Sequence, residues 1–417
     1  CIGKLAHLEH LDLENNDIGS SIPNEITNLS NLMYLDLDNN ALTSTIPVNI
    51  KGLDDLEYLS IRNNQLTGPL PSFECLSDLW FLDLGQNQLT GSITSAFCDN
   101  LNSLKELYLD NNELQNSLPA DMDKLGAGKL EYLHLQYNGF TGAIKDTGIN
   151  QLTSLIELRV DHNFFKGEIG DISGLTSTEL IQYDWNARTD CDDCKCTMEG
   201  TIPESMCDPS RTIVIDEEYI VCPDDCCDYS NKDCGETDQF IIENCDNAEA
   251  INTPGTPDNL ALVWLKTKKY NAHLDRKSDY GKSRLLQRYI LVLLYYATEG
   301  DGWANRDNWL TPFHECDGLT DPNQPVTDTG EICVNDCPID KSWYGINECD
   351  TNGNVLKIEL DNNKLKGYLP KCIGKLAHLE HLDLENNDIG SSIPNEITNL
   401  SNLMYLDLDN NALTSTI

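Results

Sequence analysis

The amino-acid sequence predicts an α/β fold, a right-handed solenoid in which short parallel strands line one concave sheet and disulfide-stapled caps close the ends. Three observations predict it. Leucines recur with a period of roughly 24 residues. An asparagine follows each pair of strand leucines at a constant offset. The 17 cysteines gather mainly outside the leucine array, where the ends of a solenoid need covering.

The repeat is visible from Leu5-x-x-Leu8-x-x-Leu11-x-Leu13-x-x-Asn16 onward. Each x-Leu-x-Leu-x stretch is expected to form one strand, because its leucines can be buried only against the neighbouring repeats. The asparagine is expected to face inward, where its amide satisfies backbone groups of the turn. It recurs at Asn40, Asn64, Asn87, Asn112, Asn138 and Asn163. This is the leucine-rich repeat pattern, and it predicts a leucine-rich repeat solenoid with a parallel concave β-sheet over residues 1–203.

A long stretch of the chain occurs twice. Residues 1–46 and 372–417 are identical at every position, at an offset of 371 residues. Both copies are interrupted within the repeat array, and such ends expose core leucines and strand edges. We therefore expect the chain to be one stretch of a continuing series of 371-residue units, joined covalently or by stacking.

After the first solenoid, the sequence predicts a cap that ends it, a linker, and the cap that starts a second solenoid. After the solenoid, residues 204–245 are polar, acidic and Cys-rich and are predicted to form its C-terminal cap. Residues 246–258 contain two Thr-Pro pairs, which disfavour helix, and are predicted to be a linker. Residues 259–354 are predicted to be the N-terminal cap of the next unit, with a helix over 283–298, and residues 355–417 its first repeats.

Several motifs resemble secreted leucine-rich repeat proteins of plants and algae. They are the Ile22-Pro23 and Leu70-Pro71 turns, the helix that runs into GDGW, and the Trp343-Tyr344-Gly345 segment between cysteines. The cap sequences CPDDCC and LYYATEGDGW are most similar to algal, diatom-like members. The resemblance implies an extracellular or cell-surface location. Residues 317–337 depart from it by inserting sequence and two further cysteines, which leaves the cysteine pairing of this cap open.

Charge and motif content exclude several functional classes. The chain has 28 Lys and Arg against 69 Asp and Glu, a formal net charge of −41. This balance argues against a nucleic-acid partner, because phosphates need clustered basic residues. No nucleophile elbow, phosphate-binding loop, kinase signature or HExxH motif is present, so no enzyme, catalytic residue or cofactor is predicted. The most apolar run, residues 285–297, is too short to span a bilayer and contains Arg288.

The cysteines indicate disulfides formed in an oxidising compartment. Counting Cys1 and Cys372 once leaves 16 cysteines, an even number. Zinc is the rival interpretation at Cys191-x-x-Cys194, but no second CxxC or HxxxH follows, so no metal site is predicted. Cys75 and Cys98, 23 residues apart, are expected to bond between adjacent repeats. The other candidates are Cys191, Cys194, Cys196, Cys207, Cys222, Cys226, Cys227, Cys234, Cys245, Cys316, Cys333, Cys337, Cys349 and Cys372.

The concave strands carry the candidate binding residues, which are aromatic and acidic side chains in successive repeats. They are His10, Tyr34, Tyr58, Phe81, Tyr108 and Tyr132 with Asp12, Asp36 and Asp83. Aromatic rings beside carboxylates could hold a glycan or a basic peptide. The competing interpretation, which the sequence favours, is that Tyr and Asp simply suit a wet strand, since single exposed aromatics need no function.

Two further kinds of surface site are indicated. The acidic columns could also bind Ca²⁺, a cation that prefers oxygen ligands, although Asp350-x-Asn352-Gly353-Asn354 lacks the distal Glu of a calcium loop and is interpreted as a turn. The N-glycosylation sequons are Asn28-Leu29-Ser30 and Asn399-Leu400-Ser401, away from the concave strands. Thr253 and Thr256 are candidates for O-glycosylation.

Charge is unevenly distributed between the two predicted caps. Acidic residues of the C-terminal cap (Asp224, Asp225, Asp228) would face basic residues of the N-terminal cap (Lys266, Lys268, Lys269, Arg276, Arg284). Head-to-tail docking of the caps would propagate into a filament of this protein with itself, loosened by high salt. The leading prediction is thus a structural or adhesive extracellular protein that forms filaments. The alternative is a ligand-binding ectodomain that recognises a glycan or peptide on its concave face.

Overall fold

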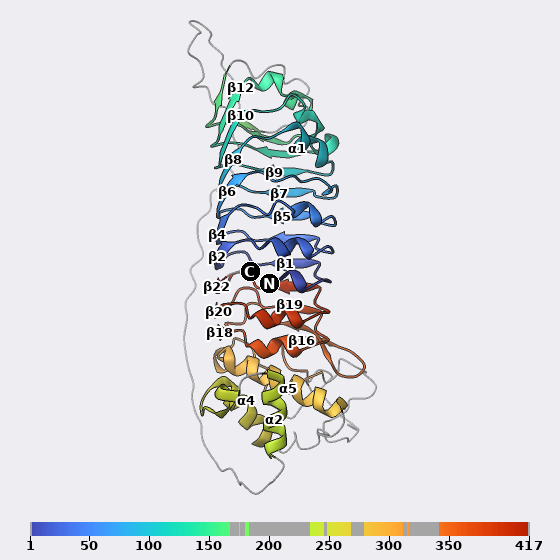
Figure 1. The fold of residues 1–417 in the computed structure, drawn as a ribbon, viewed down its shortest axis with the longest axis vertical. Helices are drawn as coiled ribbons and strands as arrows, with labels where there is room; N and C mark the ends of the chain where they lie inside the picture. The colour runs from blue at the N-terminus through green and yellow to red at the C-terminus, as the bar shows by residue number, and fades with distance from the viewer. Residues whose placement is uncertain are drawn as a thin grey trace, which may run out of the picture.

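The computed structural model describes residues 2–166, 175, 180–182, 234–245, 248–267, 279–311, 315–316 and 342–415. These residues form one long solenoid with a helical cap at one end (Figure 1). The predicted fold is confirmed: each repeat adds one strand to a parallel sheet and returns over the opposite side through short 3₁₀ turns. The strand leucines are fully buried between neighbouring repeats, as the repeat pattern predicts.

The concave sheet has twelve strands. In spatial order they are β15 (Leu180–Gln182), β13 (Glu157–Arg159), β11 (Tyr132–His134), β9 (Glu106–Tyr108), β7 (Phe81–Asp83), β5 (Tyr58–Ser60), β3 (Tyr34–Asp36), β1 (His10–Asp12), β21 (Tyr405–Asp407), β19 (His381–Asp383), β17 (Val355–Glu359) and β16 (Ile346–Cys349). All pairs are parallel except β16 with β17, which is antiparallel. The strand β16 covers the edge of β17 at the capped end.

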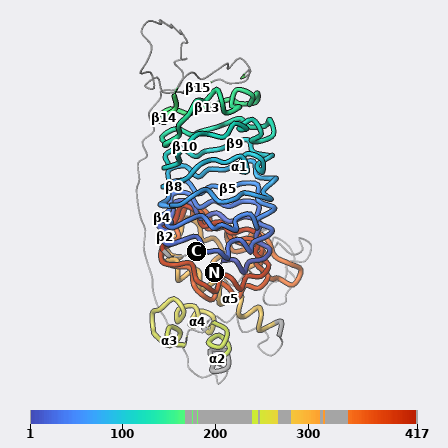
Figure 2. Tube along the Cα trace, turned by 45° about the horizontal axis from the view of Figure 1, so that its top comes forward, coloured from blue at the N-terminus to red at the C-terminus, as the bar shows by residue number. Residues whose placement is uncertain are grey.

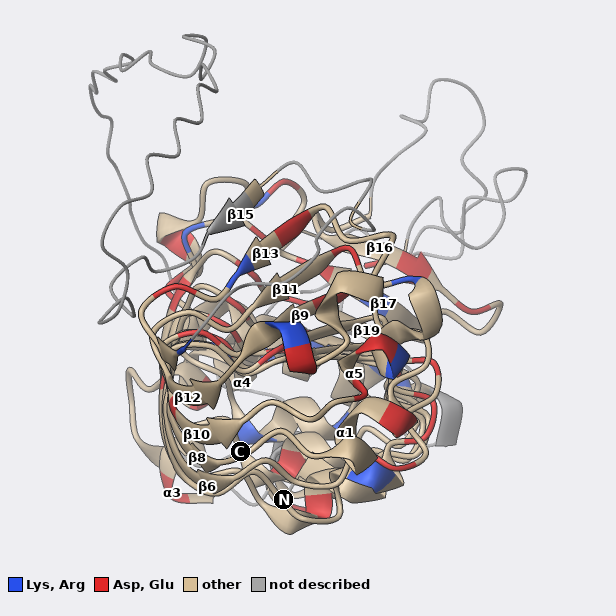
Figure 3. Ribbon diagram, turned by 90° about the horizontal axis from the view of Figure 1, so that it is seen from above, with Lys and Arg blue, Asp and Glu red and all other residues tan. Residues whose placement is uncertain are grey.

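A second parallel sheet, which the leucine pattern does not indicate, lies beside the first. Its ten strands are β14 (Phe164–Phe165), β12 (Gly139–Gly142), β10 (Glu113–Ser117), β8 (Gln88–Gly91), β6 (Gln65–Pro69), β4 (Ala41–Ser44), β2 (Asp17–Ser21), β22 (Ala412–Ser415), β20 (Asp388–Ser391) and β18 (Lys366–Tyr368). Viewed from above, strands such as β9 and β11 lie on one side of the coil and β8 and β10 on another (Figure 3). The strands of this sheet bury one apolar side chain each, and β18 buries none, so their sequences show little periodicity.

The inward-facing asparagines bond as predicted. The Asn87 side chain donates from Nδ2 to the carbonyls of Ile61 (2.8 Å) and Gly85 (3.1 Å) and accepts from the Leu66 amide (3.0 Å). Equivalent bonds recur in the other repeats, so the asparagine column satisfies backbone groups that the turns leave unpaired. The residue before it has positive φ in many repeats, for example 51° at Asn63, a conformation that asparagine tolerates well.

The two copies of the duplicated sequence stack on each other. Strand β21 pairs with β1 in register, with His10 opposite Tyr405, and β22 pairs with β2. Asn16 extends the asparagine column across this junction: its amide donates to the Leu408 carbonyl (3.0 Å) and accepts from the Leu413 amide (3.0 Å). Spatially, the repeats of the second copy therefore precede those of the first, and the ends of the chain lie close together (Figures 1 and 2).

The cap consists of helices packed on the first repeats. Its helices are α2 (Cys234–Cys245), α3 (Ala248–Asn252), α4 (Pro257–Thr267) and α5 (Asp279–Ala297), with η9 (Gly300–Gly302) after them. Among the described residues, the other helices are α1 (Ser95–Asn100) and the 3₁₀ turns η1 (Ile2–Lys4), η2 (Asn24–Asn28), η3 (Ile50–Gly52), η4 (Met122–Gly128), η5 (Ile144–Asp146), η6 (Ile149–Gln151), η10 (Lys371–Lys375) and η11 (Asn395–Asn399). The helix predicted over 283–298 is the main part of α5.

Two boundaries predicted from the sequence are wrong. The linker over 246–258 contains α3 and the start of α4, because Pro257 occupies the first position of α4, where a missing N–H costs nothing. Helix α2, predicted to belong to the C-terminal cap, instead packs on η10 beside the N-terminal cap. A disulfide between Cys245 and Cys372 fixes it there, and cysteine spacing alone cannot give such connectivity. Residues 204–233 lie outside the described residues.

The structure tests some of the predicted disulfide bonds. Cys316 and Cys349 form a disulfide, whereas Cys75 and Cys98 are free, so the predicted bond between them is wrong. Cys75 is exposed, while the buried Cys98 thiol lies 3.7 Å from the Met122 sulfur, within the core. The candidate cysteines 191, 194, 196, 207, 222, 226, 227, 333 and 337 lie outside the described residues, and Cys234 begins α2.

The candidate glycosylation residues differ in accessibility. Asn28 and Asn399 are exposed at the ends of η2 and η11, on the side opposite the concave strands. Thr253 is also exposed. The Thr256 hydroxyl donates to the Ala250 carbonyl (2.6 Å) and accepts from the Asn259 amide (3.2 Å), an N-cap arrangement for α4. Asp350 forms the predicted turn, accepting from the amides of Asn352 and Asn354 at 2.8 Å each.

Candidate ligand-binding face

The first concave position of successive strands carries a continuous column of stacked rings. We call this column the aromatic ladder; it consists of His381, Tyr405, His10, Tyr34, Tyr58 and Phe81. Neighbouring ring centroids are 4.0–4.3 Å apart and their planes differ by at most 10°. The in-register parallel strands bring equivalent side chains together, so the ladder follows directly from the repeat. The sequence favoured the interpretation that these aromatics are single exposed rings, whereas in the structure they stack on one another.

Carboxylates occupy the next two concave positions of the same strands. We call the eight residues of β19, β21, β1, β3 and the loops after them the acidic face: Asp383, Glu385, Asp407, Asp409, Asp12, Glu14, Asp36 and Asp38. Several are well buried, for example Asp36 at 3% exposure. In the described part of the chain, none of the eight forms an ion pair with Lys or Arg. Acidic residues also predominate over basic ones on the solenoid as a whole (Figure 3).

Burial and mutual repulsion raise the pKa values of the aspartates in the acidic face. Burial raises the pKa of Asp12 to about 9, against hydrogen bonding from the Glu14 amide. Burial, and then the nearby Asp36, raises the pKa of Asp38 to about 8. The pKa values of Asp383 and Asp409 are raised to about 7, again mainly by burial. This surface therefore holds protons near neutral pH and would gain from a cation that replaced them.

The ladder and the acidic face are coupled by hydroxyl groups. The Tyr34 and Tyr58 hydroxyls both donate to Oδ2 of Asp36 at 3.3 Å. The Tyr405 hydroxyl donates to Oδ2 of Asp407 at 3.0 Å. Burial lowers the pKa of His10 and of His381 to about 4, so both imidazoles are neutral at pH 7.

Arg62 lies where the carboxylates without an ion-paired Lys or Arg end and carboxylates with such a partner begin. Its guanidinium reaches Asp83 at 3.1 Å and Asp110 at 2.8 Å, two repeats away. Burial would raise the pKa of Asp110, but the hydrogen bonds from Arg62 and Asn111 hold it below its ordinary value. In the next two strands, β9 and β11, Tyr108 and His134 occupy the position that Asp83 and the earlier aspartates hold.

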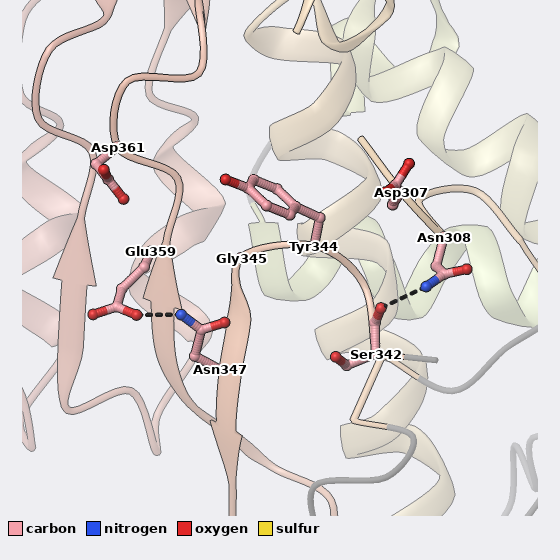
Figure 4. A pocket seen from close by; sticks show the side chains of 8 residues that line it. All are labelled: Asp307, Asn308, Ser342, Tyr344, Gly345, Asn347, Glu359 and Asp361. Carbon is pink, nitrogen blue, oxygen red and sulfur yellow. Dashed lines mark hydrogen bonds between the residues drawn. The ribbon is translucent and has the colours of Figure 1, made fainter. Parts of the chain in front are cut away.

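A polar pocket of about 390 Å³ lies where the acidic columns meet the cap. Its lining includes Glu359 and Asp361, together with Asp307, Tyr344 and Asn347 (Figure 4). Glu359 lies beside Asp383 of the acidic face, one repeat nearer the cap. The Asn347 amide donates to Glu359, which also pairs with Lys357 at 2.6 Å. The pocket therefore continues the acidic surface to the capped end.

Four groups of donor atoms on this face lie within 4.8 Å of one another among the described residues. Two contain only carboxylates (Glu14, Asp36, Asp38; Asp383, Glu385, Asp407) and two contain a histidine (His10, Asp12, Asp407; Glu359, His381, Asp383). The carboxylate groups have the oxygen chemistry that the calcium alternative requires, and binding of Ca²⁺ remains a prediction.

Most of the predicted concave residues are brought together, and two are not part of the ladder. Tyr108 lies opposite Asp83, two residues after the ladder position of its strand, and its ring is tilted against Phe81 with centroids 5.6 Å apart. Glu106 separates Tyr132 from Phe81 along the same column. His381, Tyr405, Asp407 and Asp409 were not predicted as binding residues, because the stacking of the second copy on the first is not visible from either copy alone.

The predicted basic side of a cap-to-cap contact is not confirmed where it can be checked. Arg284 is buried inside the cap, 2.8 Å from Glu315, so it is unavailable to a neighbouring unit. Lys266 lies at the end of α4. Lys268, Lys269, Arg276, Asp224, Asp225 and Asp228 lie outside the described residues. None of the described helices is long and apolar enough to cross a membrane.

Comparison with known proteins agrees with the fold. Leucine-rich repeat profiles match residues 30–89 and, individually, residues 7–29, 103–125 and 378–400. The chain is 45% identical over 67 residues to pollen receptor-like kinase 2 of Arabidopsis thaliana, and 42% identical over 65 residues to leucine-rich repeat protein 1 of the same plant. These segments are 16% of this chain in each case, and 10% and 28% of the relatives. The chain thus spans a minor part of both relatives.

Among solved structures, similarity covers 99% of this chain in the ectodomain of the Arabidopsis receptor kinase GASSHO1/SCHENGEN3, which was solved with CASPARIAN STRIP INTEGRITY FACTOR 2. That match has 22% identity, a TM-score of 0.40, and covers 39% of the receptor chain. A plant ice-binding protein matches 44% of this chain with 21% identity and a TM-score of 0.31. Similarity at this level carries no functional assignment to this chain.

Proposed function

We propose that this protein is an extracellular, non-enzymatic ligand-binding protein whose concave surface recognises an extended basic peptide segment. The observation that carries the proposal is the acidic face: eight carboxylates on four adjacent repeats without an ion-paired Lys or Arg in the described part of the chain. Such a surface attracts cations and repels anionic partners. The raised pKa values support the same reading, because a bound cation would replace the protons that these carboxylates retain.

The aromatic ladder favours a peptide over a glycan. A sugar ring binds an aromatic side chain mainly by lying on its face. Here each inner ring already has a neighbouring ring about 4 Å away on both faces, so only ring edges point outward. Ring edges and tyrosine hydroxyls offer contacts to an extended backbone, while the flanking carboxylates accept Lys or Arg.

The geometry of the strands supports an extended partner. Adjacent repeats place equivalent carboxylates roughly 4.8 Å apart, and basic side chains on one side of an extended peptide recur every ~6.8 Å. Four repeats therefore offer several carboxylates within reach of two or three basic residues. The pocket lined by Glu359 and Asp361 extends this surface to the cap.

The duplicated sequence offers a matched test with two double variants. Glu14→Gln/Glu385→Gln removes two charges from the concave face, and Glu25→Gln/Glu396→Gln removes two charges from η2 and η11 on the opposite side. The probe is a fluorescein-labelled (Arg-Ser)₄ peptide, with (Glu-Ser)₄ as its acidic counterpart. We expect the concave variant to weaken (Arg-Ser)₄ binding about tenfold, since two charge contacts contribute about 0.5–1 kcal/mol each.

Fluorescence anisotropy in about 0.1 M salt measures the affinities. The Glu25→Gln/Glu396→Gln variant should bind (Arg-Ser)₄ within twofold of the parent protein, and (Glu-Ser)₄ should not bind. Equal losses in both variants would show non-specific charge attraction and contradict the proposal. Tighter binding of a neutral oligosaccharide than of (Arg-Ser)₄ would favour the glycan alternative instead.

Self-assembly is a second candidate function, favoured by the junction between β21 and β1. The same in-register contact, made between two copies instead of within one, would join chains head to tail. Because this contact consists of backbone bonds, the Asn16 amide and buried leucines, it should resist salt, unlike charge docking between caps.

Light scattering after size-exclusion chromatography tests the assembly over a hundredfold range of protein concentration. The candidate predicts a mass that rises above the 46.7 kDa of one chain as concentration increases, in low and high salt alike. A constant single-chain mass would rule it out, and dissociation by salt would favour charge docking.

A further inference from the structure

We propose that His10, Asp12 and Asp407 form a binding site for a divalent transition-metal ion of the zinc type. Two of these residues lie on β1, and Asp407 lies on β21, across the junction of the duplicated sequences. The site shares His10, Asp12 and Asp407 with the aromatic ladder and the acidic face, but it does not rest on the proposed peptide recognition, because its ligand and its test differ.

The donor atoms are close together. One ring nitrogen of His10 and one carboxylate oxygen from each aspartate lie within 4.8 Å of one another. Around a tetrahedral zinc ion with bonds of about 2.0–2.2 Å, neighbouring donors are roughly 3.3–3.6 Å apart. Small side-chain rotations would therefore bring the three donors onto one ion, and strands hold their backbones in register.

The histidine provides an independent indication of a ligand. The Nε2 atom of His10 is buried and has no hydrogen-bond partner. The ring cannot easily turn away, because Tyr34 and Tyr405 stack on its two faces with centroids 4.2 Å away. A buried nitrogen without a partner is costly, and coordination would satisfy it.

The two aspartates lack a cationic partner. Asp12 and Asp407 are 8% and 4% exposed and adjacent in register, and in the described part of the chain neither forms an ion pair with Lys or Arg. Asp407 accepts from the Asp409 amide (3.1 Å) and the Tyr405 hydroxyl (3.0 Å), which orient its carboxylate. A divalent cation bound here would compensate the charge of both carboxylates once they are ionised.

The donor chemistry selects the class of metal. One imidazole with two carboxylates suits Zn²⁺ and its neighbours among the divalent transition metals. Calcium takes oxygen ligands, so a histidine donor disfavours it.

A second histidine serves as a matched comparison. His381 has the same His-Leu-Asp sequence and lies near Glu359 and Asp383. However, Lys357 is 2.6 Å from Glu359 and already neutralises that carboxylate. Of the two groups that contain a histidine, only the His10 group is therefore assigned a transition-metal ion.

The test is a titration of the full chain with Co²⁺, a coloured substitute for zinc, after alkylation of free thiols. The parent protein should bind one equivalent with visible d–d absorption, and Zn²⁺ should abolish the colour by displacement. His10→Tyr removes the donor but keeps the ladder, since tyrosine occupies the neighbouring positions at Tyr34 and Tyr405. We expect His10→Tyr and Asp407→Asn to weaken Co²⁺ binding at least tenfold.

His381→Tyr is the control and should leave affinity and stoichiometry unchanged. Circular dichroism of each variant verifies that it is folded. Unchanged binding in both His10→Tyr and Asp407→Asn, or no Co²⁺ binding by the parent protein, would overturn the proposal. Loss of binding in His381→Tyr alone would place the metal elsewhere and also overturn it.

Discussion

Glu315→Gln is expected to destabilise the cap by about 3–5 kcal/mol, the range found when one partner of a buried ion pair is removed. Glu315 is fully buried; its Oε1 atom accepts from Arg284 (2.8 Å) and Gln287 (2.9 Å). Arg288, also fully buried, has its nearest guanidinium nitrogen 4.0 Å from the other carboxylate oxygen. Without the negative charge, two arginines would remain buried among aromatic rings and backbone carbonyls.

Urea unfolding followed by tryptophan fluorescence measures this effect. Four of the six tryptophans lie in the cap, at positions 264, 303, 309 and 343, so the signal reports mainly on this region. The matched control is Glu74→Gln, which removes the partner of Lys51 in an exposed ion pair and should change the stability very little, because solvent screens exposed pairs. Similar small losses for both variants would show that Glu315 does not hold the cap together.

Stability is expected to fall as the pH rises from about 6.5 to 8.5 in metal-free buffer. Asp38 illustrates the sign: its folded pKa is raised from 3.8 to about 8, mainly by burial. Between these values the folded protein holds a proton that the unfolded chain has released, so the free energy of unfolding decreases with pH until about pH 8. Asp383 and Asp409, with pKa values raised to about 7, act in the same direction.

Histidines oppose this trend only at lower pH. His10 and His381 have folded pKa values lowered from 6.5 to about 4, so stability they contribute is lost as pH falls below 6.5. Above pH 6.5 these two histidines no longer change the stability, and the decline reflects the carboxylates named above. Thermal unfolding of the parent, Asp38→Asn and the exposed control Asp54→Asn tests this account: Asp38→Asn should flatten the decline, and Asp54→Asn should not. Stability that rises over this range would contradict it.

The solenoid could be predicted because its determinants are local and repeated. The strand leucines and the asparagine at Asn87 and its equivalents each specify one contact with the next repeat, and many repeats agree. The concave residues followed from strand alternation, so His10, Tyr34 and Asp36 were placed on the correct surface. Their joining into a ladder depends on in-register stacking, which gives single residues a collective role.

The features that the sequence did not predict depend on contacts between distant segments. Cys245 bonds to Cys372 across 127 residues, and cysteine positions do not specify a partner. Arg284 looked like a surface charge because its partner Glu315 is 31 residues away, beyond the rest of α5 and the segment that carries Trp303 and Trp309. The second sheet was missed because its strands, such as β10, bury one leucine among exposed polar residues.

The most direct test of the central claim is to map where a basic ligand contacts this surface. An (Arg-Ser)₄ peptide carrying a photoreactive benzophenone can be cross-linked to the full chain, and the attached residues identified by mass spectrometry. We predict cross-links to the concave strands near Tyr34, Tyr58 and Tyr405, reduced by Glu14→Gln/Glu385→Gln. Cross-links confined to the opposite side, around η2 and η11, would show that the acidic face is not the binding surface.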